Sequence, residues 1–164
     1  MTQDYVTAHQ ASLTMPNTAF AELMAAVLER GAPFRFAAPG FSMSPFIHDG
    51  DVITLAPAPP RIRFGDVVAF VNPPYGKLTV HRVVGIAREA YRVKGDNLPE
   101  EDGVIARRHI LGRVTRVERA GRNVRLGLGM ERVVIAFLSR RGWLFPVLVR
   151  IWRIVRPLAK RFVT

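Results

Sequence analysis

From Pro33 to about Leu126 the chain is a series of short β-branched runs separated by glycine, proline and aspartate. Such runs predict strands joined by turns, and their regular spacing favours an antiparallel barrel or sandwich. A continuously apolar run such as Val67–Val71 predicts a strand that is buried on both faces. We therefore expect a mainly β fold. The predicted strands cover Val52–Leu55, Val67–Val71, Leu78–Ile86, Tyr91–Val93 and Ile110–Val117.

One helix is predicted before this β region. Its apolar side chains recur at helical spacing from Phe20 to Leu28, Asn17 or Thr18 can cap its start, and Gly31 can end it. The pattern divides the chain into an N-terminal arm and helix, a β domain, and a basic helical tail that begins after Gly129. These units cover residues 1–32, 33–129 and 130–164.

The start of the chain lacks the basic and apolar regions of a secretory signal. Residues 1–33 also contain no apolar run near the ~18–20 residues that a membrane span requires. We therefore expect the chain to begin and stay in the cytoplasm.

The tail carries most of the excess positive charge. Residues 131–164 contain eight basic residues and one acidic residue, a net charge of +7 out of +11 for the whole chain. Near its end, apolar residues including Trp152 and Phe162 share one helical face, and basic residues share the other. This pattern predicts a basic amphipathic helix, kinked near Pro157, on an anionic membrane surface. We expect a peripheral or monotopic protein on the cytoplasmic side, with no nucleic-acid partner, because no reading motif accompanies the charge.

Three segments of the β region carry residue types that together suit acyl transfer. Ser42 lies in a turn, His81 lies in an apolar predicted strand, and Asp96 and Asp102 lie in a loop rich in glycine, proline and acidic residues. A serine hydroxyl is a weak nucleophile until a base accepts its proton, and a carboxylate holds that base in the useful tautomer. The series predicts a serine hydrolase that needs no metal or organic cofactor. The absence of cysteine excludes disulfides and thiolate catalysis.

His81 is the best placed of the four histidines to act as the base. His9 falls in the N-terminal arm, His109 follows two arginines, and His48 falls in a turn soon after Ser42. A lone histidine within an apolar strand is more often structural, but the Val80-His81-Arg82 context favours the role of the base.

The three segments resemble the type I signal peptidases, in which a Ser-Met-x-Pro segment precedes a base-bearing strand and a Gly-Asp-Asn box. Here the matching residues are Ser42–Pro45, His81 and Gly95–Asn97, with Gly50-Asp51 and Gly65–Val68 between them. Bacterial members place lysine where this chain has His81, whereas the endoplasmic-reticulum and archaeal branch places histidine followed by arginine. The chain resembles that histidine branch over roughly residues 34–118.

The resemblance implies a signal-peptidase-like antiparallel β fold and a serine endopeptidase. The substrate would be an extended peptide or preprotein segment with small side chains before the cut, held by strand addition at a sheet edge. Ser42 would be the nucleophile, His81 the base and Asp102 its partner. Asp96 is expected to tie together the backbone N–H groups of its own loop, and Asn97 is given the same structural role.

Lys77 and Lys94 are alternative bases, because bacterial signal peptidases and self-cleaving repressors use a Ser–Lys dyad. Neither lysine occupies the position that matches the family's base, so His81 remains the expected base.

Two features differ from the family's pattern. Gly40 stands where the family has a serine whose hydroxyl helps to bind the oxyanion, which leaves the backbone N–H of Ser42 as the expected donor. The family's N-terminal membrane anchor is also not found in residues 1–33. Met43 and Phe41, beside the nucleophile, either line a small apolar pocket or pack in the core.

Two other functions stay open at this point. One is a catalytically inactive module of the same fold that grips an extended peptide, which Gly40 favours. The other is a self-cleaving regulator, for which the short arm before Thr18 leaves little room for a DNA-binding domain.

Overall fold

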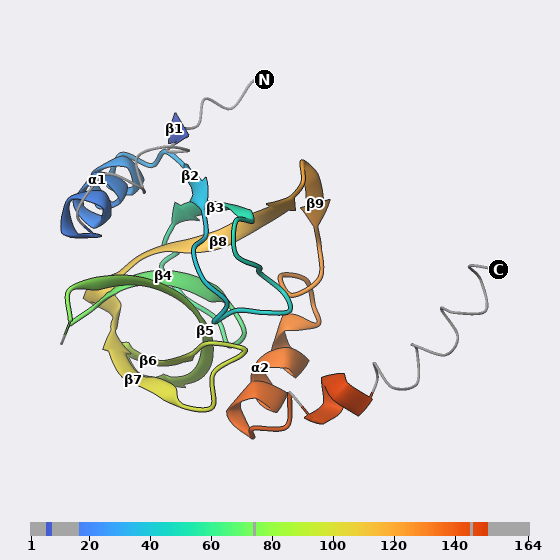
Figure 1. The fold of residues 1–164 in the computed structure, drawn as a ribbon. Helices are drawn as coiled ribbons and strands as arrows, with labels where there is room; N and C mark the ends of the chain where they lie inside the picture. Colours follow the sequence, from blue (N-terminus) through green and yellow to red (C-terminus); the bar gives the residue numbers. More distant parts are fainter. Residues whose placement is uncertain (1–5, 8–16, 74, 145, 151–164) are drawn as a thin grey trace.

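The computed structural model describes residues 6–7, 17–73, 75–144 and 146–150 (Figure 1). These residues form a mainly β structure, with one helix before the main strands in the sequence and helical segments after them. The helices are α1 (Asn17–Glu29) and α2 (Arg132–Arg140), followed by a further helical stretch over 146–150. The strands are β1 (Val6–Thr7), β2 (Phe34–Ala37), β3 (Val52–Pro57), β4 (Val67–Asn72), β5 (Lys77–Ala87), β6 (Ala90–Lys94), β7 (Glu101–Ala106), β8 (Ile110–Arg119) and β9 (Arg122–Val124).

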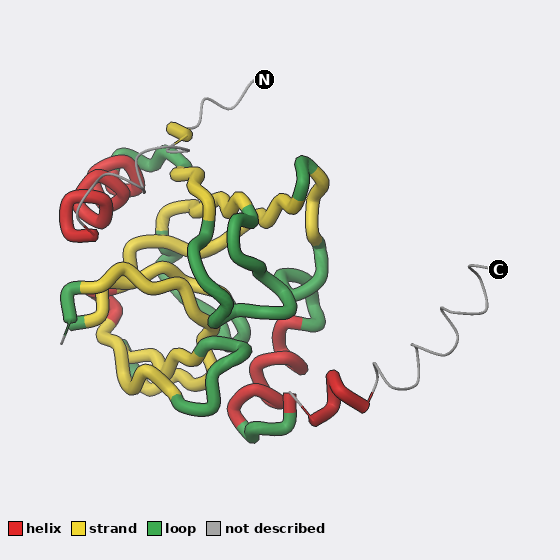
Figure 2. The backbone as a smooth tube through the Cα atoms, viewed as in Figure 1, coloured by secondary structure: helices red, strands yellow, loops and turns green. Residues whose placement is uncertain are grey.

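The described strands form one sheet in the order β1-β2-β3-β8-β4-β5-β6-β7, and β9 pairs with β8. All pairs are antiparallel except β1 with β2. The register shifts at four places, in the pairs β3–β8, β4–β8, β5–β6 and β6–β7. Such irregularities increase the local bend and twist of a strand. The sheet accordingly curls into a half-barrel, which Figure 2 shows as a ring of strands with α1 outside it.

Strand β4 separates two hydrophobic cores because successive side chains of a strand point to opposite faces. Val67 and Ala69 belong to the core beneath α1, where Phe20 of the helix meets Phe34 edge-on. Val68 and Phe70 belong to the second core, inside the curled part of the sheet. The expectation that this run is buried on both faces is therefore confirmed.

The sequence-based prediction of a mainly β fold with an N-terminal helix is confirmed. The five predicted strands lie within β3, β4, β5, β6 and β8. The acid-rich segment around Asp102 was predicted as a loop, and this prediction was wrong, because Asp102 lies in β7. β7 is an edge strand with a glycine in its middle, and it shows little alternation of apolar residues. The predicted amphipathic helix near Trp152 lies outside the described residues, and none of the described helices is long and apolar enough to cross a membrane.

Asp51 closes the loop that joins β2 to β3, where Ser42 lies. Its backbone C=O accepts from the Ala38 N–H, and its carboxylate accepts from the His48 N–H and from the Arg119 guanidinium. Burial raises the pKa of the Asp51 carboxyl, but the hydrogen bonds from Arg119 and His48 outweigh it and hold that pKa below its usual value. The ionised carboxylate thus joins the end of the loop to β8, and the backbone C=O of Asp51 joins the two ends of the loop to each other.

We predict that Asp51→Asn lowers the free energy of unfolding by about 1–3 kcal/mol near neutral pH, because charged hydrogen bonds to a buried group are lost. A carboxyl with a depressed pKa stabilises the fold above about pH 4, and this contribution disappears as the pH falls through the folded-state pKa. Urea unfolding should show a larger acid-induced loss of stability for the wild type than for Asp51→Asn. Glu29→Gln, at an exposed carboxylate, is the control, and identical pH profiles for the wild type and Asp51→Asn would contradict this account.

Candidate active site

Ser42 lies in a tight turn within the loop that joins β2 to β3. The turn is closed by the Ser44 N–H, which donates to the Phe41 C=O, and by the Ile47 N–H, which donates to the Met43 C=O. The Met43 side chain is buried in the core beneath α1, whereas Phe41 is exposed. The buried methionine anchors the turn, so that the half-exposed Ser42 hydroxyl faces the sheet.

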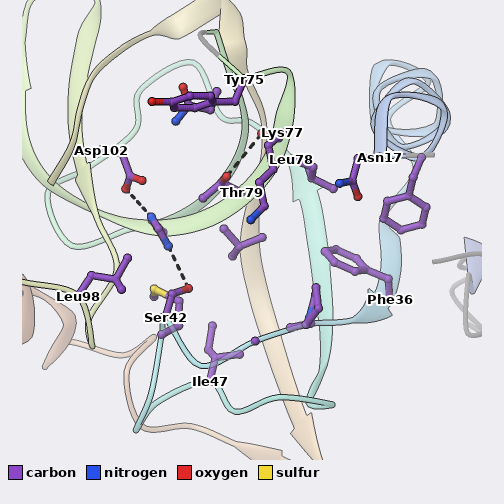
Figure 3. Close-up of a pocket in the computed structure, with 18 of the residues that line it drawn as sticks. Asn17, Phe36, Ser42, Ile47, Tyr75, Lys77, Leu78, Thr79, Leu98 and Asp102 are labelled. Atoms are coloured by element: carbon purple, nitrogen blue, oxygen red, sulfur yellow. Dashed lines mark hydrogen bonds and ion pairs between the residues drawn. The ribbon is translucent and has the colours of Figure 1, made fainter. Parts of the chain in front are cut away.

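Ser42, His81 and Asp102 form one continuous chain of hydrogen bonds (Figure 3). The His81 Nε2 atom lies 3.0 Å from the Ser42 Oγ atom, and the His81 Nδ1 atom contacts the Asp102 Oδ2 atom. The serine comes from the turn after β2, the histidine from β5 and the aspartate from β7. The three residues that the sequence singled out are therefore brought together from three separate parts of the sheet.

The surroundings of His81 favour the tautomer that a general base needs. The ring is 4% exposed, and Phe70 packs against it at 6.3 Å between ring centroids. A proton on Nδ1 is held by the Asp102 carboxylate, so the Nε2 lone pair faces the Ser42 hydroxyl. The arrangement can take the serine proton and return it without moving either ring neighbour.

Asp96 does not have the role that was expected for it. Instead of tying together the N–H groups of its own loop, its carboxylate pairs with the Arg82 guanidinium, at 2.9 Å from Nε and 2.7 Å from Nη2. Arg82 is completely buried and also donates to the carbonyls of Gly65 and Gly127. A buried cation of this kind requires a carboxylate partner, and this requirement explains the correction.

The residues on either side of Asp96 support the Ser42 turn. The Asn97 N–H donates to the Ser42 C=O at 2.8 Å, and the Asn97 side-chain amide donates to the Phe41 C=O at 3.3 Å. A Cβ atom at Gly95 would lie 2.8 Å from the Ser42 C=O, so only glycine fits there. The Gly-Asp-Asn box thus supports the Ser42 turn from behind. Asn97, which was expected like Asp96 to tie together the N–H groups of its own loop, instead donates to carbonyls of this turn.

One backbone donor of the turn is free to bind an oxyanion. Among the described residues, the Ser42 N–H donates to no acceptor. Gly40 brings no side chain to this place, and its own N–H donates to the Asp49 carboxylate at 2.7 Å. Gly40 has a φ of +87°, a conformation in which a serine would be strained. Both the missing side chain and the local backbone therefore leave this position without a side-chain donor for an oxyanion.

A cavity of about 700 Å³ opens beside the Ser42 hydroxyl. It lies between the segment from Phe36 to Gly40 and the strand β5 (Figure 3). Its wall near the serine is apolar and includes Ala38, Met43 and Ile47. Met43 both packs in the core and lines this cavity, so the two roles considered for it from the sequence are combined.

The edge of β5 that faces this cavity is open. The Val83 N–H and C=O point toward β4, since they bond Asp66 and Gly65. By the alternation of a strand, the backbone groups of Val80 and Leu78 point to the opposite side. β6 pairs with β5 only from Arg82 onward, so no strand of the described sheet lies beside Leu78 and Val80. This edge can accept an extended peptide.

The alternative bases do not reach the Ser42 hydroxyl in the described structure. Lys94 is buried, and its Nζ atom donates to the Ser139 C=O at 2.6 Å, near the C-terminal end of α2. Lys77 is exposed and lines the same cavity, but no hydrogen bond joins its side chain to the Ser42 hydroxyl. Within the described ranges, no group of three or more histidine, aspartate or glutamate residues is arranged to hold a metal ion.

Arg82 is the residue of the site that sequence reasoning passed over. In the sequence it stands out only as the neighbour of His81. An arginine within an apolar strand nevertheless indicates a buried ion pair, because such a charge needs a carboxylate partner. No protein-family model matches this chain, and no curated protein matches it in sequence. Its function is therefore inferred from the residues and geometry of the site.

We predict that Asp96→Asn lowers the free energy of unfolding by about 3–5 kcal/mol, because it leaves the buried Arg82 cation without its counter-charge. The matched control is Glu101→Gln, which breaks the more exposed Arg92–Glu101 pair and should cost less than about 1 kcal/mol. Urea unfolding followed by circular dichroism measures both. Equal losses for the two variants would contradict the structural role of the buried pair.

Proposed function

We propose that this protein is a serine endopeptidase in which Ser42 is the nucleophile, His81 the general base and Asp102 the residue that orients the base. One observation carries the proposal. The hydroxyl, the imidazole and the carboxylate lie in hydrogen-bonded order at the wall of a cavity, next to an open strand edge. A structural histidine needs neither a serine on one ring nitrogen nor a carboxylate on the other.

In the proposed reaction the Ser42 Oγ atom attacks the scissile carbonyl carbon while His81 Nε2 takes the hydroxyl proton. The Ser42 N–H stabilises the resulting oxyanion, an interaction worth about 3 kcal/mol per donor in well-studied hydrolases. His81 then gives its proton to the leaving amine as the C–N bond breaks, and an acyl-serine remains. A water molecule, deprotonated by His81, hydrolyses this ester and restores the serine hydroxyl.

The substrate class follows from the cavity and from the open edge. An extended segment would lie along Val80 and Leu78 and receive main-chain hydrogen bonds from β5. The apolar wall formed by Ala38, Met43 and Ile47 leaves room for small side chains just before the cut. These features support the substrate that the resemblance to signal peptidases implies, namely a peptide or preprotein with small residues at that position.

The second candidate is a peptide-binding module of the same fold without catalytic activity. Gly40 favours it, because the turn offers no side-chain donor to the oxyanion at that position. Both candidate functions use the cavity and the open strand edge to bind a peptide. They differ only in whether the bound peptide is cleaved. A self-cleaving regulator has no observation of this kind in its favour.

We predict that the wild type cleaves a preprotein with small residues before the cut, and that Ser42→Ala and His81→Ala each reduce kcat by several orders of magnitude while peptide binding persists. The two residues act as one unit, so the double variant should be no slower than either single variant. Asp102→Asn should also lower kcat strongly, because the amide stabilises the wrong imidazole tautomer. Cleavage is measured by mass spectrometry of the products.

Lys77→Ala is the control, since Lys77 lines the same cavity but has no part in the proposed proton transfers. It should change KM more than kcat. Binding of the peptide by the wild type without cleavage would favour the inactive module, and full activity in a folded Ser42→Ala variant would exclude the mechanism.

A further inference from the structure

The outward side of α2 is apolar although it faces solvent. Val133, Val134 and Phe137 are all exposed, whereas Ile135 and Ala136 on the opposite side are buried. At 100° per residue the exposed positions fall within one arc of the helix. Nearby Met130 and Trp143 are exposed too, at 89% and 54%. We call these five exposed residues, with Arg140 and Arg141, the α2 outer face.

The α2 outer face combines aromatic rings with cations. The Arg141 guanidinium lies 5.0 Å from the centre of the Phe137 ring and 5.9 Å from that of the Trp143 ring. Arg140 is exposed beside it. Tryptophan, phenylalanine and arginine in contact are typical of the boundary between lipid headgroups and acyl chains, where rings enter the apolar layer and the cation stays with the phosphates.

The charge around the α2 outer face identifies an anionic partner. Glu131 is the last acidic residue of the chain, and its carboxylate already accepts the N–H groups of Gly127 and Gly129. If two copies of the chain met through this face in a two-fold symmetric contact, Arg140 and Arg141 of one copy would face those of the other. The face has no free carboxylate to pair with them. A nucleic acid would pair the arginines but leave Val133 and Phe137 in water. An anionic bilayer satisfies both the arginines and the apolar side chains.

We propose that the α2 outer face docks on the surface of an anionic lipid bilayer, with Phe137 and Trp143 entering the interface. The helix is joined to the sheet by the Lys94–Ser139 hydrogen bond and by the contact of Arg132 with Asp66 at 3.4 Å. A bilayer on this face therefore holds the β domain in a defined orientation. The inference is independent of the proposed peptidase activity, and its test needs no substrate.

The test measures co-sedimentation of the full chain with vesicles. The wild type should bind vesicles of phosphatidylcholine mixed with phosphatidylglycerol, and bind pure phosphatidylcholine vesicles much more weakly. The double variant Arg140→Gln with Arg141→Gln should bind about 25-fold more weakly at low salt, about fivefold for each arginine near the surface. Val134→Ser with Phe137→Ser should weaken binding at least about tenfold, because less apolar surface enters the lipid.

The matched control is Ile86→Ser with Val104→Ser, which removes exposed apolar side chains from β5 and β7. It should bind like the wild type. The insertion itself is followed in a Trp152→Phe protein, where Trp143 is the only tryptophan. Its emission should shift to shorter wavelength with phosphatidylglycerol-containing vesicles and stay unchanged with pure phosphatidylcholine.

Several results would overturn the proposal. Equal binding by Val134→Ser with Phe137→Ser and by the control variant would place the contact elsewhere, for example in residues 151–164. A Trp143 emission that is already blue-shifted without vesicles, and does not change with them, would mean that the chain itself covers this face. A lipid-free dimer that Val134→Ser with Phe137→Ser disrupts would assign the face to a second copy.

Discussion

The structure depends on the complete burial of one cation, the Arg82 guanidinium. Its donors reach the Asp96 carboxylate and the carbonyls of Gly65 and Gly127, and it lies over the Phe46 ring at 5.5 Å. These partners come from four different connections between the strands and helices. Breaking a buried ion pair costs several kcal/mol, so arrangements that separate any of these segments from Arg82 are strongly disfavoured. One side chain thereby links four connecting segments around the candidate site.

His81 and Ser42 of the candidate active site are next to Arg82 and to its partner Asp96 in the sequence or in space. His81 precedes Arg82 in β5, and neighbouring side chains of a strand point to opposite faces, so the imidazole reaches the cavity while the guanidinium enters the interior. The partner Asp96 is flanked by Gly95 and Asn97, which hold the Ser42 turn from behind. The Arg82–Asp96 pair is thus positioned by the same two segments that position His81 and Ser42. Loss of the pair should disturb the serine and the histidine together.

Much of the site could be predicted from the sequence, because the order of a serine, a strand histidine and two aspartates constrains the chemistry. Strands with strong β-branched runs, such as β4, were predicted for the same reason. The edge strand that carries Asp102 was not, since its charged and glycine-containing sequence reads as a loop. The partner of Asp96 was also missed, because a pairing with Arg82 depends on burial that no local pattern shows. The buried Arg82–Asp96 pair could not be predicted because it joins residues whose burial depends on the whole fold.

In the proposed mechanism, the chain of hydrogen bonds through His81 activates the Ser42 hydroxyl. The most direct measurement is labelling of the folded protein with a fluorophosphonate probe, followed by mass spectrometry of the modified peptide. We expect an adduct on Ser42 in the wild type and labelling that is slower by orders of magnitude in His81→Ala, with the fold of both proteins verified by circular dichroism. An unlabelled wild type, or equally fast labelling of Ser42 in His81→Ala, would contradict the proposed mechanism.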